Sequence, residues 1–307
     1  MRIDDVLVVG GTGFVGHHLC AELARLGVTV TVPARRRERA RELLLLPTVD
    51  VVQADVHAPG VLARLTRDKQ AVVNLVGILH GRRGRPGERG PNDYGPDFAR
   101  VHVELPQAIV SACRANGVRR LVHLSAIGAD AKAPSEYLRS KGIGEQVVFA
   151  AEDLDVTVFR PSVIFGPEDQ FLNRFARLAG VLPALGLPRP DARFQPVYVR
   201  DVARAVALSL DPERSHGWRY ELGGPREYTL KELVELVCRI TGRRRWVFGL
   251  PDRLAYLQAR MLEMLPGELM SRDNLESMKV PNVTSEPFPF GIQPQALEAI
   301  APTYLAA

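Results

Sequence analysis

A tyrosine and a lysine four residues apart carry the clearest sign of chemistry in this sequence. Tyr137 and Lys141 lie in a segment with helical spacing, where residues four apart share one face. A nearby ammonium can lower the pKa of a phenol from about 10 and make it a usable acid or base. Ser125, at the end of a predicted strand, could hydrogen-bond a substrate carbonyl or hydroxyl. A surface Tyr–Lys pair is the alternative interpretation, because this spacing arises often by chance.

A glycine-rich loop near the N-terminus predicts a dinucleotide site. The loop Gly10-Gly11-Thr12-Gly13-Phe14-Val15-Gly16 follows a buried strand and opens the first helix. Small residues let the backbone approach a pyrophosphate there, and free N–H groups and the helix dipole favour its charge. Asp55-Val56 and Asn74-Leu75-Val76-Gly77 end two further strands, where an adenosine would lie. We favour this interpretation over a plain glycine-rich turn.

The residues after the second strand favour NADP(H) over NAD(H). An NAD site usually places Asp or Glu there, roughly 20 residues past the glycines, to bind the ribose 2′-hydroxyl. This chain has Pro33-Ala34-Arg35-Arg36-Arg37 instead. Guanidinium groups suit a 2′-phosphate through charge-assisted bidentate bonds. An exposed basic helix start would also explain these arginines, and the two interpretations do not exclude each other.

Alternating strands and helices must position these residues. The hydrophobic pattern predicts strands at 6–9, 28–32, 49–53, 71–76, 120–124 and 156–159. It predicts helices at 14–26, near 61–65, at 98–115 and at 135–151. It also predicts a basic helix that follows the second strand and ends at Leu46. Strands separated by helices of this length imply right-handed crossovers and a parallel sheet covered on both faces. The fold class is therefore α/β, with a doubly wound parallel sheet.

The pattern loosens after Pro161. Proline-rich connections separate strand candidates at 197–199 and 218–222 from amphipathic helices at 230–241 and 253–265. We predict a dinucleotide-binding domain over 1–160 and a smaller mixed α/β substrate-side lobe over 161–307. The two are interleaved, since strands from 194–200 and 218–223 could join the first domain. Residues 81–95 are rich in Gly, Arg and Pro and predict an exposed loop.

Composition narrows the classes of function. A net charge of +5 is too small a surplus to predict nucleic-acid binding. The three cysteines are scattered without C-x-x-C spacing, so we expect buried thiols and no metal site. The longest apolar stretch, 71–79, is too short to cross a bilayer, and no secretory signal is recognisable. We therefore expect a cytoplasmic protein.

Together these motifs resemble the short-chain dehydrogenase/reductase superfamily in its extended, sugar-epimerase-like form. The segment from Arg160-Pro161-Ser162-Val163 to Pro167 adds to the likeness. More narrowly, residues 123–130, 197–203, 271–274, 279–280 and 302–305 resemble an atypical branch of the NAD(P)-dependent epimerase/dehydratase family. That branch contains the 39 kDa accessory subunit of respiratory complex I and its bacterial relatives. The resemblance implies a Rossmann-type sheet with a C-terminal substrate lobe.

The resemblance also assigns roles to single residues. It makes Tyr137 the acid/base and Lys141 the residue that lowers the tyrosine pKa and holds the nicotinamide ribose, while Ser125 orients the substrate. It places Asn173 and Arg200 toward the substrate. His102 departs from the family pattern, which commonly has Asn there. The predicted cofactor-binding residues are Gly10, Thr12, Gly13, Phe14, Val15, Gly16, Arg35, Arg36, Asp55, Val56, Asn74, Val76, Gly77, Lys141, Pro161 and Val163.

Three functions remain open at this point. The leading one is an NADP(H)-dependent oxidoreductase or a nucleoside-diphosphate-sugar epimerase or dehydratase that uses hydride transfer. The alternative is a non-catalytic, cofactor-stabilised accessory or assembly protein of a respiratory or quinone-synthesising complex, peripherally bound at the inner face of the membrane. A redox-sensing binding protein is the third. The substrate stays unassigned, and a homodimer could form through the helices at 98–115 and 135–151.

Overall fold

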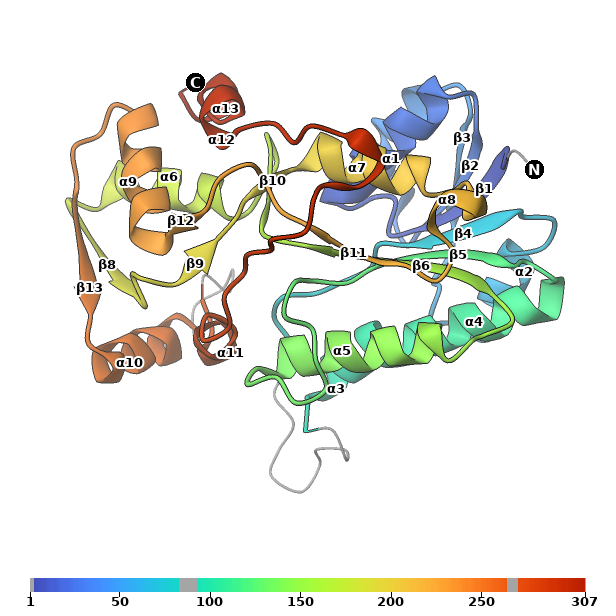
Figure 1. Ribbon diagram of the computed structural model, residues 1–307, viewed down its shortest axis with the longest axis horizontal. Coiled ribbons are helices and arrows are strands. Elements are labelled where there is room, and N and C mark those ends of the chain that lie inside the picture. The colour runs from blue at the N-terminus through green and yellow to red at the C-terminus, as the bar shows by residue number, and fades with distance from the viewer. Residues whose placement is uncertain (1–2, 83–92, 264–269, 307) are drawn as a thin grey trace.

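One parallel sheet forms the centre of the described part of the chain, residues 3–82, 93–263 and 270–306 of this computed structural model (Figure 1). Its seven strands are β1 Asp5–Val9, β2 Thr29–Ala34, β3 Val49–Gln53, β4 Ala71–Asn74, β5 Arg120–Leu124, β6 Asp155–Pro161 and β11 Arg219–Leu222. They lie in the order β11-β6-β5-β4-β1-β2-β3, and all neighbours are parallel. The order reverses between β1 and β4, where such sheets bind ligands at the carboxyl ends of their strands. The predicted Rossmann-type sheet is confirmed.

Helices cover both faces of this sheet, as Figure 1 shows. On one face, α1 (Phe14–Arg25) and α7 (Val199–Leu208) pack their buried Leu and Val side chains against the strands. On the other face lie α2 (Val61–Leu65), α4 (Leu105–Asn116) and α5 (Glu136–Phe149). Strands buried on both faces explain the continuous apolar runs, such as Val6-Leu7-Val8-Val9 in β1.

Two connections differ from the predicted helices. The segment after β2 forms two short 3-10 turns, Arg37–Ala40 and Leu43–Leu45, and not the basic helix expected up to residue 46. Only a few apolar side chains of this segment are buried, among them Ala40 and Leu43, so little packing is available to support a longer helix. The helix predicted over 98–115 begins as α3 (Pro96–Phe98) and passes through a π-helical stretch, Ala99–Glu104, before α4.

The C-terminal half contributes to both parts of the molecule. Strand β11 joins the large sheet beside β6, and α7 packs on α1. By contrast, the strands within 194–200 lie outside the large sheet. Here β9 (Arg193–Phe194) pairs with β12 (Tyr228–Thr229), β10 (Val197–Tyr198) pairs with β7 (Ile164–Phe165), and Val199 already begins α7. Residues 194–200 therefore add no strand to the large sheet, and the division of the chain into two domains stays a prediction.

A smaller lobe carries the remaining elements, at the left of Figure 1. Its two-stranded parallel sheet pairs β8 (Ala184–Pro188) with β13 (Trp246–Leu250). Around it lie α6 (Leu172–Val181), α9 (Leu230–Ile240), α10 (Asp252–Leu262) and α11 (Arg272–Ser277). Short helices complete the chain: α8 (Pro212–Ser215), a 3-10 turn at Pro289–Gly291, α12 (Leu297–Ile300) and α13 (Pro302–Leu305). Most of the loop predicted at 81–95 lies outside the described residues.

A buried ion network fixes α5 to the edge of the large sheet. The Glu145 carboxylate on α5 is 1% exposed and meets Arg160 of β6 at 2.7 Å and Arg219 of β11 at 3.1 Å. The Arg160 guanidinium also donates to the carbonyl oxygen of Ala129 at 2.8 Å. Because α5 carries Tyr137 and Lys141, this network sets the position of both side chains relative to the strand ends.

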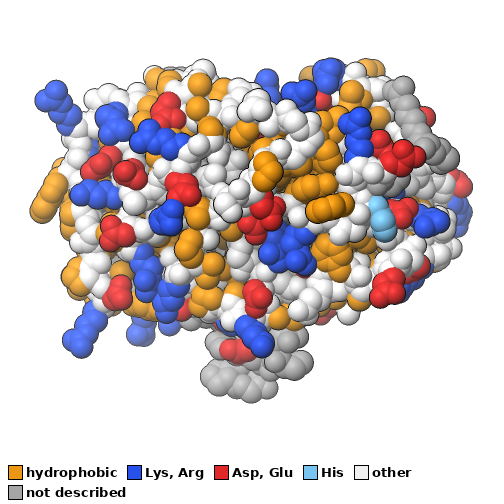
Figure 2. All heavy atoms as spheres, in the orientation of Figure 1, with side chains coloured by type: hydrophobic (Ala, Val, Ile, Leu, Met, Phe, Trp, Pro, Cys, Tyr) orange, Lys and Arg blue, Asp and Glu red, His pale blue; other side chains and the backbone are white. Residues whose placement is uncertain are grey.

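The cysteines and the surface were also subjects of sequence-based predictions. Cys20, Cys113 and Cys238 are free and buried, as predicted. Among the described residues, we find no helix long and apolar enough to cross a membrane. Lys and Arg side chains alternate with Asp and Glu over most of the face in Figure 2.

Candidate functional site

The glycine loop forms a tight turn that only glycine fits. A Cβ on Gly16 would lie 2.4 Å from the carbonyl oxygen of Gly10, and one on Gly10 would lie 3.0 Å from the amide nitrogen of Val76. Gly10 also has a φ of +91°, which favours glycine. Gly13 caps α1 without a side-chain hydrogen bond, so the first amides of the helix lack partners inside it. This arrangement of close backbone and free amides fits a pyrophosphate.

The side chain of Phe14 anchors the start of α1. Its ring lies 5.9 Å from the ring of His18 in an edge-on arrangement. A Cβ on Gly166 would come within 3.2 Å of its Cζ atom, so this ring packs closely on the 160–167 segment. Phe14 and Val15 are partly buried against the core around α9, and their backbone amides remain the groups suited to a ligand.

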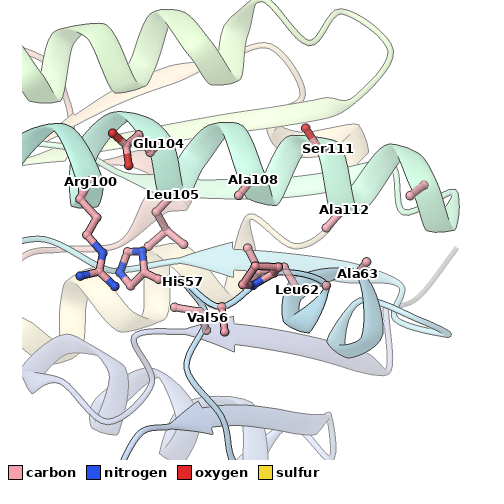
Figure 3. A pocket seen from close by; sticks show the side chains of 14 residues that line it. Val56, His57, Leu62, Ala63, Arg100, Glu104, Leu105, Ala108, Ser111 and Ala112 are labelled. Atoms are coloured by element: carbon pink, nitrogen blue, oxygen red, sulfur yellow. The ribbon is translucent and has the colours of Figure 1, made fainter. Parts of the chain in front are cut away.

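Positively charged side chains gather at the expected adenosine end. Arg35 and Arg36 follow β2 with exposed side chains. Figure 3 shows the Arg100 guanidinium beside the His57 ring, next to a cavity of about 400 Å³ that Val56 also lines. Burial lowers the pKa of His57, and the charges of Arg100 and Arg35 lower it further while Asp55 opposes them. Arg100 is a further candidate for this site that the sequence did not indicate, because no motif points to the π-helical segment.

Asp55 and Asn74 shape the strand ends through their own hydrogen bonds. The Asp55 carboxylate accepts from the His57 amide at 3.1 Å. Asn74 is buried; its Oδ1 accepts from the Val76 amide at 3.2 Å, and its Nδ2 lies 3.1 Å from Nδ1 of His123 on β5. Burial lowers the pKa of His123 to about 3, so its ring is neutral. Asn74 therefore holds the ends of β4 and β5 in place beside the crevice.

Lys141 and Ser125 meet at the end of β5. The Lys141 ammonium is buried and donates to the carbonyl oxygen of Leu124 at 2.8 Å. Ser125 follows at once in the chain, and its buried hydroxyl oxygen has no hydrogen-bond partner among the described residues. A Cβ on Gly77 would lie 3.3 Å from the Lys141 Nζ atom, so the end of β4 reaches the same point. The unpaired serine hydroxyl fits a hydrogen bond to a ligand placed between these strands.

Tyr137 starts the helix that carries Lys141, and a distant segment fixes it. Ser135 caps α5, and the carboxylate of Asp273 on α11 accepts from the amides of Glu136 at 2.7 Å and Tyr137 at 3.0 Å. The Tyr137 ring lies 5.7 Å from that of His102. None of the hydrogen bonds found among the described residues involves the Tyr137 hydroxyl.

The pKa of Tyr137 is not lowered by Lys141 in the way that the sequence led us to expect. Burial raises the pKa of Tyr137 to about 12, and the Asp273 charge adds to the effect. Burial lowers the pKa of Lys141 to about 8, with Glu145 opposing. In the protein alone, removal from water therefore outweighs any lowering of the phenol pKa by the ammonium. Near pH 7 the pair consists of a neutral phenol and an ammonium, and it is suited to giving a proton.

His102 organises the region between α5 and the end of β4. Its Nε2 accepts from the Ile78 amide at 3.1 Å, so Nδ1 must carry the proton and donate to Ser140 Oγ at 2.8 Å. Ser140 Oγ in turn donates to the Tyr137 carbonyl oxygen at 2.8 Å. Burial lowers the pKa of His102 well below its usual value, and the Lys141 charge adds to this. The histidine at this position thus forms a complete network as a neutral ring.

A large cavity begins at Tyr137 and extends into the C-terminal lobe. Its volume is about 740 Å³, and Gly77, Pro161 and Val163 line it beside Tyr137. Asn173 and Arg200 do not line it. The Asn173 amide donates to the carbonyl oxygens of Pro167 and Asp169 near the start of α6, and Arg200 is exposed at the start of α7.

Comparisons with known proteins agree with this geometry. The sequence model of the NAD dependent epimerase/dehydratase family matches residues 6–223. The chain is 30% identical to mitochondrial NADH dehydrogenase (ubiquinone) 1 alpha subcomplex subunit 9 of Rattus norvegicus, over 95% of this chain and 77% of that protein. It is 29% identical to the ceramide reductase of Caulobacter vibrioides, over 80% and 74%.

A solved structure shares the fold. The UDP-glucuronic acid 4-epimerase of Bacillus cereus, in complex with UDP-glucuronic acid and NAD, superposes with a TM-score of 0.70 at 17% identity and covers 98% of both chains. The glycine loop, the parallel sheet, the family match and the relative with 30% identity agree. This chain belongs to the NAD dependent epimerase/dehydratase family.

Proposed function

We propose that this chain is an NADP(H)-dependent reductase that acts on a carbonyl group. The observation that carries the proposal is that Tyr137 lines a large cavity together with Gly77 and Ala126, which adjoin Lys141 and Ser125 at the end of β5. Among the described residues, the hydroxyls of Tyr137 and Ser125 have no hydrogen-bond partner. When bound, the reduced nicotinamide supplies a hydride to the carbonyl carbon. The C=O double bond becomes an alkoxide C–O, which needs one proton.

Tyr137 is the proton donor in this proposal. Because burial holds its pKa at about 12, the phenol is protonated across the physiological range and can give its proton to the alkoxide oxygen. Ser125 Oγ donates a hydrogen bond to the same oxygen. The Lys141 ammonium stabilises the tyrosinate that remains until solvent returns a proton. A protonated phenol suits catalysis of the reduction, and a relative named as a ceramide reductase supports this choice.

NADP(H) is the proposed cofactor. Two exposed arginines follow β2, where an acidic residue would serve the ribose 2′-hydroxyl of NAD. Arg100 and His57 add donors at the same end. Hydrogen bonds to a charged group contribute about 1.5–3 kcal/mol, so NADPH should bind roughly 10–100 times more tightly than NADH. Equal dissociation constants in a calorimetric titration would contradict this assignment.

Replacement of Tyr137 by Phe tests the catalytic role. Loss of a positioned proton donor should lower turnover by about 10²- to 10⁴-fold, measured as NADPH oxidation with a carbonyl substrate. NADPH affinity and the unfolding midpoint should stay at wild-type values, because the hydroxyl has no hydrogen-bond partner among the described residues. Full activity in the Tyr137→Phe variant would exclude the mechanism.

A second candidate function follows from the mitochondrial relative. That protein is named as a subunit of an NADH dehydrogenase, so a peripheral role in a respiratory complex at the membrane is a specific alternative. In that case the cofactor would be structural. Co-purification with such a complex, and full cellular function of the Tyr137→Phe variant, would support this role. Absence of the complex from a native purification, together with loss of function in the variant, would favour the reductase.

A further inference from the structure

The large cavity is lined in a way that does not suit a sugar nucleotide. On top of the reductase function proposed above, we propose that it binds the aliphatic chain of an amphiphilic lipid, with the reacting carbonyl held at Tyr137. The walls of this cavity come from elements far apart in the chain, among them α5, α6, β8 and α10.

Helix α6 and strand β8 form two apolar walls. Phe171, Phe175, Leu178 and Leu182 lie at helical spacing on one face of α6, and all four line the cavity. Leu185 and Leu187 do so from β8. The Phe171 ring also packs on Phe175 and on Phe194, which closes this side with aromatic surface.

The opposite walls are apolar as well. Leu262 of α10, Met270, and Met278 beside α11 line the cavity there. Methionine side chains are flexible and adapt to ligands of irregular shape. A continuous apolar lining of this size favours burial of methylene groups.

Charged groups are scarce among the described residues that line the cavity. Arg174 is the one Lys or Arg, and no Asp or Glu is present. The Arg174 guanidinium also donates to the Gln170 carbonyl at 3.2 Å. A nucleoside diphosphate needs cations for two phosphates and polar partners for its base. The described lining residues provide one guanidinium for that purpose.

Most polar side chains of the lining are engaged with the protein itself. His80 lies 2.8 Å from the Asn274 carbonyl oxygen, and Asn274 caps α11. Ser162 donates to Asn282 at 2.7 Å. Two buried polar atoms have no partner among the described residues, Gln258 Oε1 on α10 and Ser277 Oγ on α11. They could serve one hydroxyl or amide group of an amphiphile.

Hydrophobic side chains surround the end of the cavity that opens to the surface of the protein. Leu182 both lines the cavity and is 41% exposed, so the cavity opens there. Leu254, Leu257 and Met261 are about half exposed along one side of α10, the helix that forms another wall. Figure 2 shows hydrophobic side chains reaching the surface at the left edge, where Figure 1 places β8 and β13. An aliphatic chain can enter over such a rim with little loss of solvation.

Chain length is the variable that tests this inference. We would titrate the full-length protein, loaded with NADP⁺ to prevent turnover, with methyl esters of 3-oxo fatty acids from six to fourteen carbons, and follow heat or displacement of a fluorescent fatty acid. Each buried methylene should tighten binding about fourfold until the chain fills the cavity. UDP-glucose should bind more weakly than the longer esters.

Two neighbouring substitutions provide a matched pair. Leu182→Glu puts a charge at the opening and should weaken binding of the longest ester at least tenfold while the shortest ester changes little. Val181→Glu adds the same charge one residue earlier, at a side chain that is 83% exposed and does not line the cavity, and should leave the series unchanged.

The outcomes separate this inference from the reductase function. Affinity that does not depend on chain length, tighter binding of UDP-glucose, or equal effects of the two variants would overturn the lipid pocket, whatever the turnover. Chain-dependent binding that persists in Tyr137→Phe, with no NADPH oxidation by the wild type, would support the lipid pocket and remove only the reductase function.

Discussion

Polar side chains differ between two regions of the molecule, the ends of the central strands and the cavity in the C-terminal lobe. At the strand ends, Asn74, His102, His123 and Ser140 are buried and form specific hydrogen bonds. In the cavity, leucine, phenylalanine and methionine side chains dominate, and the few polar ones mainly contact each other. In our proposals the first region supports the cofactor and the proton transfer. The second region selects an aliphatic substrate and not a sugar nucleotide.

The largest loss of stability is expected when the ion network that holds α5 against the sheet is broken. Glu145→Gln removes the buried carboxylate that Arg160 and Arg219 share, while Glu221 stays 3.7 Å from Arg160. Breaking a buried ion pair costs about 3–5 kcal/mol. The free energy of unfolding in urea should fall by that amount. Asp153→Asn, in an exposed pair with Arg114, should leave the free energy of unfolding close to the wild-type value. Similar losses in both variants would contradict the anchoring role.

A smaller effect is expected on NADPH affinity when the arginines at the adenosine end of the site are replaced. The double variant Arg35→Ser/Arg36→Ser should weaken NADPH binding roughly 10–100-fold, because it removes charge-assisted bonds to the 2′-phosphate. NADH binding and binding of the 3-oxo esters should not change. The exposed neighbour Arg37 gives a control: Arg37→Ser should retain most of the NADPH affinity. A uniform loss for both cofactors would indicate a general charge effect.

His102 tests whether the polar network itself matters. His102→Ala leaves the Ile78 amide and Ser140 without their partner and should destabilise the fold by about 1–3 kcal/mol. His102→Asn keeps an acceptor for the Ile78 amide and should recover part of the loss. Thermal unfolding measures both. If Asn and Ala are equally destabilising, the histidine contributes through its ring packing on Phe98 and not through hydrogen bonds.

The smallest effect concerns pH. Lys141 has a pKa lowered to about 8, so its ammonium is present below that pH and is lost above it, while Tyr137 stays protonated up to about 12. We expect kcat/KM for reduction to fall about tenfold per pH unit above pH 8. A profile that stays level up to pH 10 would show that the Lys141 charge does not support the proton transfer.

The sequence by itself determined the cofactor half of this protein. The alternating strands, the glycine loop and the Tyr137–Lys141 spacing depend on local rules of periodicity and backbone space, which a sequence displays directly. The buried strands are compatible with few folds other than a parallel sheet, and the turn at Gly16 has no space for a side chain. The segment after β2 was predicted wrongly as a helix, because too few of its apolar side chains are buried to support one.

Only the tertiary structure decided the properties of the groups in the site. The pKa of Tyr137 depends on burial and on Asp273, which is far away in the chain, and no spacing pattern reveals Arg100 beside His57. Asn173 and Arg200, which were expected toward the substrate, do not line the large cavity: Asn173 donates to the carbonyl oxygens of Pro167 and Asp169, and Arg200 is exposed. The largely apolar cavity is assembled from elements far apart in the chain, among them α5, α6, β8, α10 and α11. Desolvation and cavity shape arise from contacts between distant segments, so they exist only once the chain has folded.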